Sequence, residues 1–511
     1  MKVASIVSIL LGTALLVRLG GADTYIAGPV SGNWSLLGSP YQVLADIEVP
    51  GGQTLTIDPG VSVIFNGNYK FIVHGTLSAV GSEGDSILLT HHIPHASFTW
   101  KGIYFEVAQG VSELAYCIIE WGYAQGIVGQ PDAKGGAAHV YNSTVNIHHC
   151  RISDNKADVK GAGICLNGAS GAIYANTIIN NTSMGDGGGV FAEFCSDTYL
   201  QGNWISGNSA EKGAGVQFVY NGGALEENVI TYNTATFSNG GGIYLEHSSP
   251  AIVGNVINHN SSTGTNSGSG IYCYSTSNPM ILYNEICANN HSGVYCATTS
   301  GPQLENNTIY GNLDYAIWTM QTSDPRGASN IIVGNGGSFY IPQGCSVLMS
   351  YSNIQGGYTG TGNINQQPLF VDPYGDDFHL QSSSPCIDTG SPIAPLDPDG
   401  TRADMGAHFY DQTIGIEVAE KGMPEAFEVI PWHPNPFNAQ SELNYTLPAA
   451  AQVNLSIFDL TGAVISTLVD GRQEAGRYRM EFNGSGLATG VYFYRMQIGD
   501  EINSGKLLLL K

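Results

Sequence analysis

The chain has 511 residues, of which 67 are glycine and only 12% are charged, while 42% are hydrophobic. The apolar content is enough to build a core, so the chain is not a disordered polymer. Collagen is excluded because the glycines have no three-residue period, and a helical protein is excluded because each glycine in a helix interior costs about 1 kcal/mol. What remains is a large, turn-rich all-β protein.

Almost all of the net charge of −24 lies in residues 23–414. An acidic surface of this kind repels nucleic acid, anionic lipid and polyuronate chains. We therefore expect no nucleic-acid partner. An uncharged polysaccharide or cell-surface glycan is the ligand class that this charge allows, although solubility alone also explains the acidity.

Residues 1–22 have the pattern of a signal peptide. Lys2 supplies the positive start, Val3 to Val17 is mostly apolar, and small residues end the segment at Ala22. This apolar run is short for a membrane span, and no later stretch reaches the roughly 18 apolar residues that a span needs. The sequence predicts a secreted protein without a transmembrane segment, found at the cell surface or outside the cell. Its nine cysteines are an odd number, so at least one is unpaired.

Residues 117–354 carry an internal repeat. The pattern Asn-x-Ile-x-x-Asn occurs seven times, beginning at Asn176, and degenerate copies stand on either side. The repeated isoleucines lie 22 to 33 residues apart, and a glycine cluster followed by apolar and aromatic residues lies between most copies. Such short units cannot bury a core alone, so they are typical of a solenoid whose coils stack.

Stacked coils explain why asparagine recurs twice in each repeat. Equivalent positions in neighbouring coils of a β-solenoid lie about 4.8 Å apart. At that distance, one asparagine amide can donate to the next and so satisfy the buried polar groups of the turns. The glycine clusters fit sharp turns before each strand.

These repeats resemble the right-handed parallel β-helix proteins of the pectin-lyase-like superfamily. The opening Val49–Gly60, the segment Trp100–Ile103 and the closing segments Ser384–Gly390 and Asp397–Ala407 are also similar to that family. The resemblance covers roughly residues 25–410 and implies the fold. It does not imply an activity, because the superfamily includes lyases, hydrolases and adhesins.

The C-terminal residues resemble a different family. After an acidic linker at residues 413–428, Pro434–Asn438 and the alternating strands that end in Lys506–Lys511 are similar to the C-terminal sorting domain of the type IX secretion system. That resemblance implies an Ig-like β-sandwich at residues 429–511 and the type IX secretion machinery as a partner. The predicted fold is thus all-β: a right-handed parallel β-helix over residues 23–412 followed by a small sandwich.

Alternation within the second strand of each repeat places a row of large side chains on the outside of the solenoid. Rings one coil apart suggest a surface on which sugars stack, and they also suit a ladder that merely stabilises the sheet. As candidate ligand-binding residues, the sequence nominates Phe191, Tyr244, Tyr272, Tyr295 and Trp318.

Two carboxylates are candidates for catalysis. Glu193 and Glu246 face outward two coils apart, at roughly 9.6 Å, which is at the upper edge of the spacing of an inverting glycosidase pair. Two solvated side chains on an acidic protein are the simpler interpretation. A polyuronate lyase would also need a basic residue beside calcium-binding carboxylates, and the repeats contain few bases.

Two groups of residues, one of aspartates and one of histidines, are candidate metal ligands. Asp397, Asp399 and Asp404 suggest a calcium loop but lack the EF-hand spacing, so capping of the solenoid end is the alternative. His91, His92 and His95, together with His148 or His149, match no zinc spacing. We therefore predict no obligatory cofactor and keep calcium as an option.

Three functions follow from these patterns. The first is non-catalytic binding of a glycan or surface through the outward aromatic row. The second is polysaccharide cleavage by a hydrolase or lyase, and the third is a structural or adhesive role without a defined ligand. The acidic charge and the scarcity of basic residues that a lyase would need favour the first function.

Overall fold

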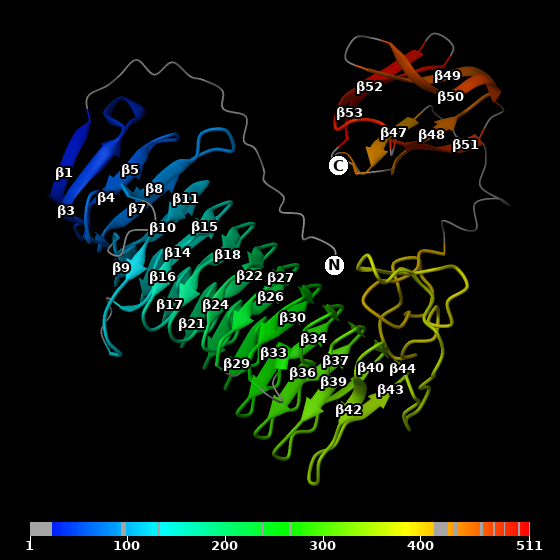
Figure 1. Ribbon diagram of the computed structural model, residues 1–511, viewed down its shortest axis with the longest axis horizontal. Helices are drawn as coiled ribbons and strands as arrows, with labels where there is room; N and C mark the ends of the chain where they lie inside the picture. Colours follow the sequence, from blue (N-terminus) through cyan, green and yellow to red (C-terminus); the bar gives the residue numbers. More distant parts are fainter. Residues whose placement is uncertain are drawn as a thin grey trace. The chain divides into compact units, whose positions relative to one another are not determined.

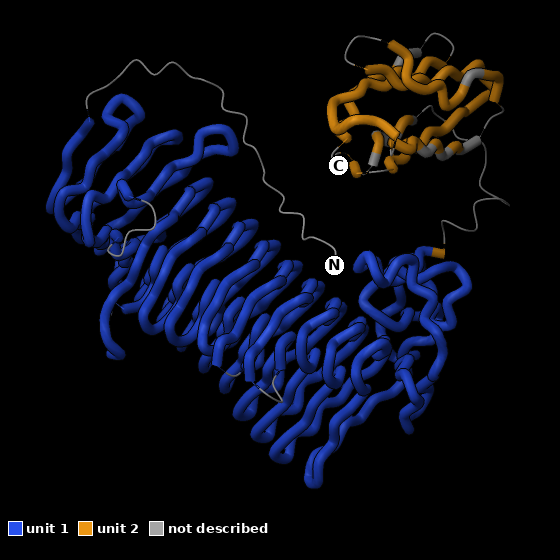
Figure 2. The backbone as a smooth tube through the Cα atoms, viewed as in Figure 1, with its two compact units in different colours: residues 1–411 blue, residues 412–511 orange. Residues whose placement is uncertain are grey.

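The computed structural model describes residues 23–93, 99–129, 133–237, 239–264, 268–412, 428–433, 435, 437–438, 440–459, 463–473, 476–484, 486–498 and 501–509. The chain divides into two compact units, residues 1–411 and 412–511 (Figure 2). The predicted signal peptide at residues 1–22 and residues 413–427 of the predicted linker lie outside the described residues.

The first unit is a parallel β-solenoid whose coils stack along one axis (Figure 1). Each coil contributes strands to three long sheets. The sheet that carries the predicted aromatic row, here called the aromatic sheet, consists of β6 (Phe71–Val73), β9 (Ile103–Glu106), β13 (Ala138–Tyr141), β17 (Ile164–Asn167), β21 (Val190–Glu193), β25 (Val216–Val219), β29 (Ile243–Glu246), β33 (Gly268–Tyr274), β36 (Ser292–Ala297), β39 (Tyr315–Thr319) and β42 (Gly337–Tyr340).

The second sheet, here called the isoleucine sheet, carries the repeated isoleucines. It consists of β1 (Thr24–Pro29), β3 (Tyr41–Val49), β5 (Ser62–Phe65), β8 (Ile87–His91), β11 (Cys117–Glu120), β15 (Arg151–Ser153), β19 (Thr177–Ile179), β23 (Trp204–Ser206), β27 (Val229–Thr231), β31 (Val256–Asn258), β35 (Glu285–Cys287), β38 (Thr308–Tyr310), β41 (Ile331–Val333) and β44 (Asn353–Ile354). Ile178, Ile205 and Ile230 pair in direct register and are fully buried, as the repeat predicts.

The third long sheet has 13 strands. They are β2 (Gly32–Trp34), β4 (Thr54–Ile57), β7 (Thr76–Val80), β10 (Val111–Ala115), β14 (Thr144–His148), β18 (Ala172–Tyr174), β22 (Tyr199–Gln201), β26 (Ala224–Glu226), β30 (Ala251–Val253), β34 (Met280–Leu282), β37 (Gln303–Glu305), β40 (Arg326–Ala328) and β43 (Leu348–Ser350). A minor sheet at one corner contains β12 (Tyr123–Ala124), β16 (Lys156–Ala157), β20 (Thr182–Ser183), β24 (Ser209–Ala210), β28 (Thr234–Ala235) and β32 (Ser261–Ser262). A single 3-10 turn, η1 (Leu36–Gly38), follows β2.

The predicted asparagine ladders are present at two corners of the coils. One ladder runs through Asn203 and Asn228, and the other through Asn208 and Asn233. In each step the side-chain amide of one residue donates to Oδ1 of its neighbour at about 2.9–3.0 Å, and the backbone N–H donates to the same oxygen. These side chains are almost completely buried, so the ladders satisfy polar groups that water does not reach.

A closing segment ends the solenoid after β44. It contains the antiparallel pair β45 (Phe370–Asp372) and β46 (Asp377–Leu380) and packs Phe370 and Phe378 against the last coils. Within the described residues all nine cysteines are free thiols. Cys117 and Cys150 lie in neighbouring coils as buried thiols, and the Cys117 N–H donates to the Cys150 sulfur, a pair here called the thiol ladder.

The second unit is made of two antiparallel sheets. One contains β47 (Glu428–His433), β48 (Gln440–Leu447) and β51 (Gly476–Asn483), and the other contains β49 (Ala451–Phe458), β50 (Val464–Gln473), β52 (Gly490–Ile498) and β53 (Glu501–Leu509). Its core includes Trp432, Tyr445, Ile457 and Met496. This arrangement fits the small β domain that the resemblance implies.

Candidate functional site

The predicted aromatic row lies in one register on the outside of the aromatic sheet. Tyr244 stacks on Tyr272 with ring centroids 5.3 Å apart, Tyr272 on Tyr295 at 4.8 Å, and Tyr295 on Trp318 at 5.8 Å. The planes in each pair lie within 12° of each other. Rings stacked in this way cover one another's faces, which leaves mainly their edges for a ligand.

These rings are also buried. Phe191 is fully covered and the three tyrosines of the row are only 4–7% exposed, whereas Trp318 is half-buried. The turns before two of these strands pack closely on the aromatic residues, since an added Cβ at Gly187 or Gly240 would lie 2.6 Å from the Cβ of Phe191 or Tyr244. In addition, Lys160 Nζ lies 4.5 Å from the centre of the Phe191 ring. The expectation of a solvent-facing row is therefore corrected, because alternation along a strand does not reveal what the preceding turn covers.

A different set of rings is exposed beside this row. Phe194, Tyr220 and His247, here called the exposed aromatic stack, directly follow β21, β25 and β29 and have left-handed backbone conformations with φ of 47–56°. Their ring centroids lie 5.3 and 4.5 Å apart. This stack was not among the predicted site residues. Its signal was available, because a ring residue follows the strand at the same position in three successive coils.

The stack ends at Phe194, which keeps an open face. Phe194 is 59% exposed although one of its faces packs on Tyr220. On its other side, the preceding coil has Gly168 at the equivalent position, next to the paired residues Asn167 and Glu193. Because glycine has no side chain, the second face of the Phe194 ring remains available for contact.

Glu193 directly precedes Phe194, and its carboxylate is engaged in hydrogen bonds. Lys160 Nζ is 3.3 Å from both Glu193 oxygens, and the Asn167 amide donates to Oε2 at 3.1 Å. Glu246 is two strands further along the sheet, with Val219 between them. The structure thus places the two predicted carboxylates on one face, but a lysine neutralises one of them and a valine separates them.

A short row of charges runs along the turns above the aromatic sheet. Lys134, Lys160, Asp186 and Lys212 occupy paired positions in successive coils. Burial raises the pKa of Asp186, while the lysines on either side lower it and partly offset that rise. Asp186 thus lies between two lysines, while Lys134 and Lys160 are neighbours of like charge.

The three aspartates considered for calcium each accept hydrogen bonds from the closing segment. Asp404 accepts from the backbone N–H of Asp388 and Tyr410, both at 2.7 Å, and Asp397 accepts from the N–H of Asp404 at 2.8 Å. Asp399 accepts from the backbone and hydroxyl of Thr401. Burial raises the pKa of Asp404 to about 6 and also raises the pKa of Asp397. They hold turns in place, and calcium binding there stays a prediction.

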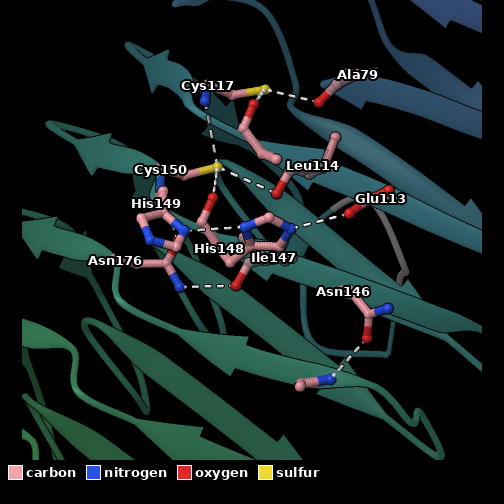
Figure 3. A network of polar contacts seen from close by, with 12 residues as sticks. Ala79, Glu113, Leu114, Cys117, Asn146, Ile147, His148, His149, Cys150 and Asn176 are labelled. Atoms are coloured by element: carbon pink, nitrogen blue, oxygen red, sulfur yellow. Dashed lines mark hydrogen bonds and ion pairs between the residues drawn. The ribbon is translucent and has the colours of Figure 1, made fainter. Parts of the chain in front are cut away.

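The histidines of the third sheet form a local network with the thiol ladder (Figure 3). His148 contacts Glu113 Oε1 through Nε2 at 3.0 Å and His149 Nδ1 through its own Nδ1 at 3.0 Å. Nearby, the Cys117 N–H donates to the Cys150 sulfur. Within the part of the chain that the structure describes, no group of three or more His, Cys, Asp or Glu side chains is placed to hold a metal; His95 lies outside that part.

No helix among the described residues is long and apolar enough to cross a membrane. Residues 432–510 match the family described as the secretion system C-terminal sorting domain. This domain marks the chain as a secreted protein, at the cell surface or outside the cell, and implies the secretion machinery as a partner.

Similar solved structures share low sequence identity with this chain. The pectate lyase Pel9A is 14% identical, with 71% of this chain and 88% of that chain covered and a TM-score of 0.37. The periplasmic alginate epimerase AlgG is 12% identical over 66% of this chain and 85% of its own, with a TM-score of 0.30. The tailspike protein gp49 of the Acinetobacter baumannii bacteriophage Fri1 is 9% identical over 90% and 74%, with a TM-score of 0.24. No curated protein sequence matched the chain.

The solenoid itself matches a family by sequence. The family described as the right handed beta helix region matches residues 96–265 and 225–371. Together these matches span more than half of the 511 residues. The family, the stacked coils and the asparagine ladders agree with one another, and the chain belongs to the right-handed β-helix family.

Proposed function

We propose that this secreted β-helix protein binds an uncharged glycan on the outside of its aromatic sheet and does not cleave it. The observation that supports the proposal is the open face of Phe194 at the end of the exposed aromatic stack. An apolar ring face suits the C–H face of a sugar, in the same way that aromatic side chains serve other amphipathic ligands. The acidic surface favours an uncharged chain over a polyanion.

Polar groups beside Phe194 suit sugar hydroxyls. Glu193 offers acceptor oxygens, and Lys160 and Asn167 offer donors that already surround that carboxylate. A hydroxyl both donates and accepts, so it can join such a network without leaving a group unpaired. The proposed site is therefore one ring face with a mixed donor and acceptor wall.

The position of Glu193 argues against hydrolysis. A general acid must reach the glycosidic oxygen of its substrate with a free carboxyl oxygen, whereas Lys160 Nζ already contacts both Glu193 oxygens at 3.3 Å. Val219 also separates Glu193 from Glu246 along the sheet.

Cleavage is the second candidate because of one observation. Asp186 has a raised pKa and lies between Lys160 and Lys212 in successive coils. A carboxyl group of this kind beside bases is the type of group that proton transfer uses.

The experiment uses the mature chain, a glycan array and calorimetric titration of the uncharged oligosaccharides that bind. We expect Phe194→Ala to weaken binding by at least about tenfold, as truncation of an aromatic anchor does. Phe237→Ala removes another exposed phenylalanine, which lies elsewhere on the chain, and should leave binding unchanged. Equal effects of the two substitutions would contradict the proposed site. Release of shorter sugars, lost in Asp186→Asn, would establish cleavage instead.

A further inference from the structure

A pocket of about 540 Å³ lies where the last coils meet the closing segment. Its volume falls in the range of about 300–1,000 Å³ that small-molecule sites occupy. Tyr310 and Val333 contribute from the coils, and Phe370, Pro373 and Tyr374 contribute from the closing segment. All of these residues belong to the first unit, and none is part of the exposed aromatic stack.

The floor of the pocket is apolar and rigid. The rings of Tyr310 and Phe370 meet edge to face with centroids 5.9 Å apart, and Phe378 packs on Tyr310 from behind at 5.2 Å. Phe370 and Phe378 are buried within the cluster that closes the solenoid. A ligand therefore meets a floor that the fold already holds in place, which lowers the cost of ordering side chains on binding.

The rim of the pocket is rich in carboxamides. Its members are Gln355, Asn365, Gln366, Gln367 and Gln381. Hydrogen bonds to the backbone orient three of them: Gln355 accepts from the Gly334 N–H at 2.6 Å, Asn365 accepts from the Gly356 N–H at 3.1 Å, and Gln381 donates to the Phe370 carbonyl at 2.7 Å. Each amide carries both a donor group and an acceptor, which matches the neighbouring hydroxyls of a sugar.

Tyr374 differs from the rings of the solenoid. It is 95% exposed, whereas the rings of the aromatic sheet cover one another. Its phenol and both ring faces thus stand at the pocket mouth without the packing that would explain a large aromatic residue there. An exposed aromatic ring beside a concave polar rim is typical of a binding site.

The charged side chains near the pocket already have hydrogen-bond or ion-pair partners within the protein. Asp372 accepts from the Gly375 N–H, Asp376 contacts His259 at 3.2 Å, and Asp377 contacts His379 at 2.8 Å. The lining itself has no Asp, Glu, Lys or Arg side chain. A charged ligand would find no counter-ion in the pocket and would lose hydration without compensation.

We infer that this pocket binds an uncharged carbohydrate, with a sugar ring against Tyr374 and its hydroxyls on the carboxamide rim. The site is separate from the one proposed at Phe194, and it does not depend on that proposal. A chain with both sites can hold a glycan on its outer sheet and a further sugar unit at the closed end of the same solenoid.

The test titrates cellohexaose, xylohexaose and mannohexaose into the mature chain carrying Phe194→Ala, so that the outer site is already removed. At least one of these sugars should bind. Adding Tyr374→Ala should weaken that binding by at least about tenfold, and Gln367→Leu should weaken it less. Tyr25→Ala, which removes an exposed tyrosine of β1, is the matched control and should change nothing.

Three results would overturn the inference. The first is that none of the three hexasaccharides binds. The second is that binding persists unchanged in the Tyr374→Ala chain, which folds normally because almost nothing packs on this side chain. The third is that hexagalacturonate, or an uncharged glycine–serine hexapeptide, binds more tightly than the neutral sugars.

Discussion

The repeated coils at residues 150–335 and the closing segment at residues 355–412 satisfy their polar groups in opposite ways. In the coils, a buried asparagine finds its partner in the identical residue one coil away, as Asn208 does in Asn233. In the closing segment each group has a unique partner, as Asp404 does in the N–H groups of Asp388 and Tyr410. In the coils, one repeated residue type therefore satisfies the polar groups of every turn. The closing segment lacks a repeat, so each of its polar groups needs a partner of its own.

This difference decides where ligands can bind. Side chains that repeat in register pack against the equivalent side chains of neighbouring coils, as the stacked rings of Tyr244, Tyr272 and Tyr295 show. Their surfaces are then not available to a ligand. Free surfaces arise where repetition stops, at Phe194 beside Gly168 and at Tyr374 in the closing segment. Interruptions of a ladder are therefore the places to look for function in a solenoid.

The largest effect is expected when a ladder is broken. In Asn233→Ala, the Asn208 N–H loses its acceptor, and the Ile205 carbonyl and the Asn260 Oδ1 lose donors. Buried polar groups without partners are costly, so we expect a loss of about 3–5 kcal/mol of stability. Thermal and urea unfolding of the mature chain measure this loss.

Asn33→Ala is the control for this change. Asn33 is an exposed residue whose side chain donates to the Asp58 side chain, and its replacement should cost less than about 0.5 kcal/mol. Similar losses in both variants would show that the ladder does not stabilise the coils.

A smaller effect is expected from the buried aromatic row. Tyr272 lies between Tyr244 and Tyr295 and is 7% exposed. Its replacement by alanine leaves a cavity and removes two stacked contacts, at a cost of about 3 kcal/mol. Tyr220→Ala, in the exposed stack, should cost about 1 kcal/mol and should instead reduce glycan binding. Calorimetric unfolding and glycan titration of both variants measure these two effects. A larger loss of stability in Tyr220→Ala than in Tyr272→Ala would contradict the prediction.

The smallest effect concerns the closing segment and pH. Burial raises the pKa of Asp404 to about 6, so between about pH 4 and 6 the folded chain holds a proton that the unfolded chain releases. Stability then falls as pH rises through this window and levels off above it, by at most about 3 kcal/mol. Hydrogen exchange at residues 386–410, corrected for the intrinsic pH dependence, should report the change. Asp404→Asn should flatten the slope, and an unchanged slope would assign it to other groups.

Much of the solenoid was predictable from sequence because its rules are local and repeated. The spacing of Ile178, Ile205 and Ile230 fixes which residues pair, and the same spacing places the asparagines at the corners. The ladder at Asn176–Asn203 follows without knowledge of any other contact. The sorting domain was likewise identifiable from its own motifs.

The candidate sites were harder to predict because exposure is not a local property. Alternation places Tyr244 on the outside of its strand, but a preceding turn at Gly240 covers it. The pocket combines Tyr310, Gln355 and Gln381, which come from separate segments that only the closed fold brings together. These pocket residues follow no repeat in the sequence, so sequence spacing does not identify them. Phe194 was within reach, since it is the first of three ring residues that follow successive strands at the same position, after Gly168 in the preceding coil.

The asparagine ladders also have a direction. Each backbone N–H of a ladder donates to a side-chain oxygen one coil nearer the C-terminus, and one ladder ends when Asn330 donates to Ser352 and Ser352 donates to Asn363. Asn363 of the closing segment therefore supplies the last acceptor of that ladder. A chain cut before Asn363 would leave the Ser352 N–H without this acceptor, so the exposed end of the solenoid needs the closing segment to complete its hydrogen bonds.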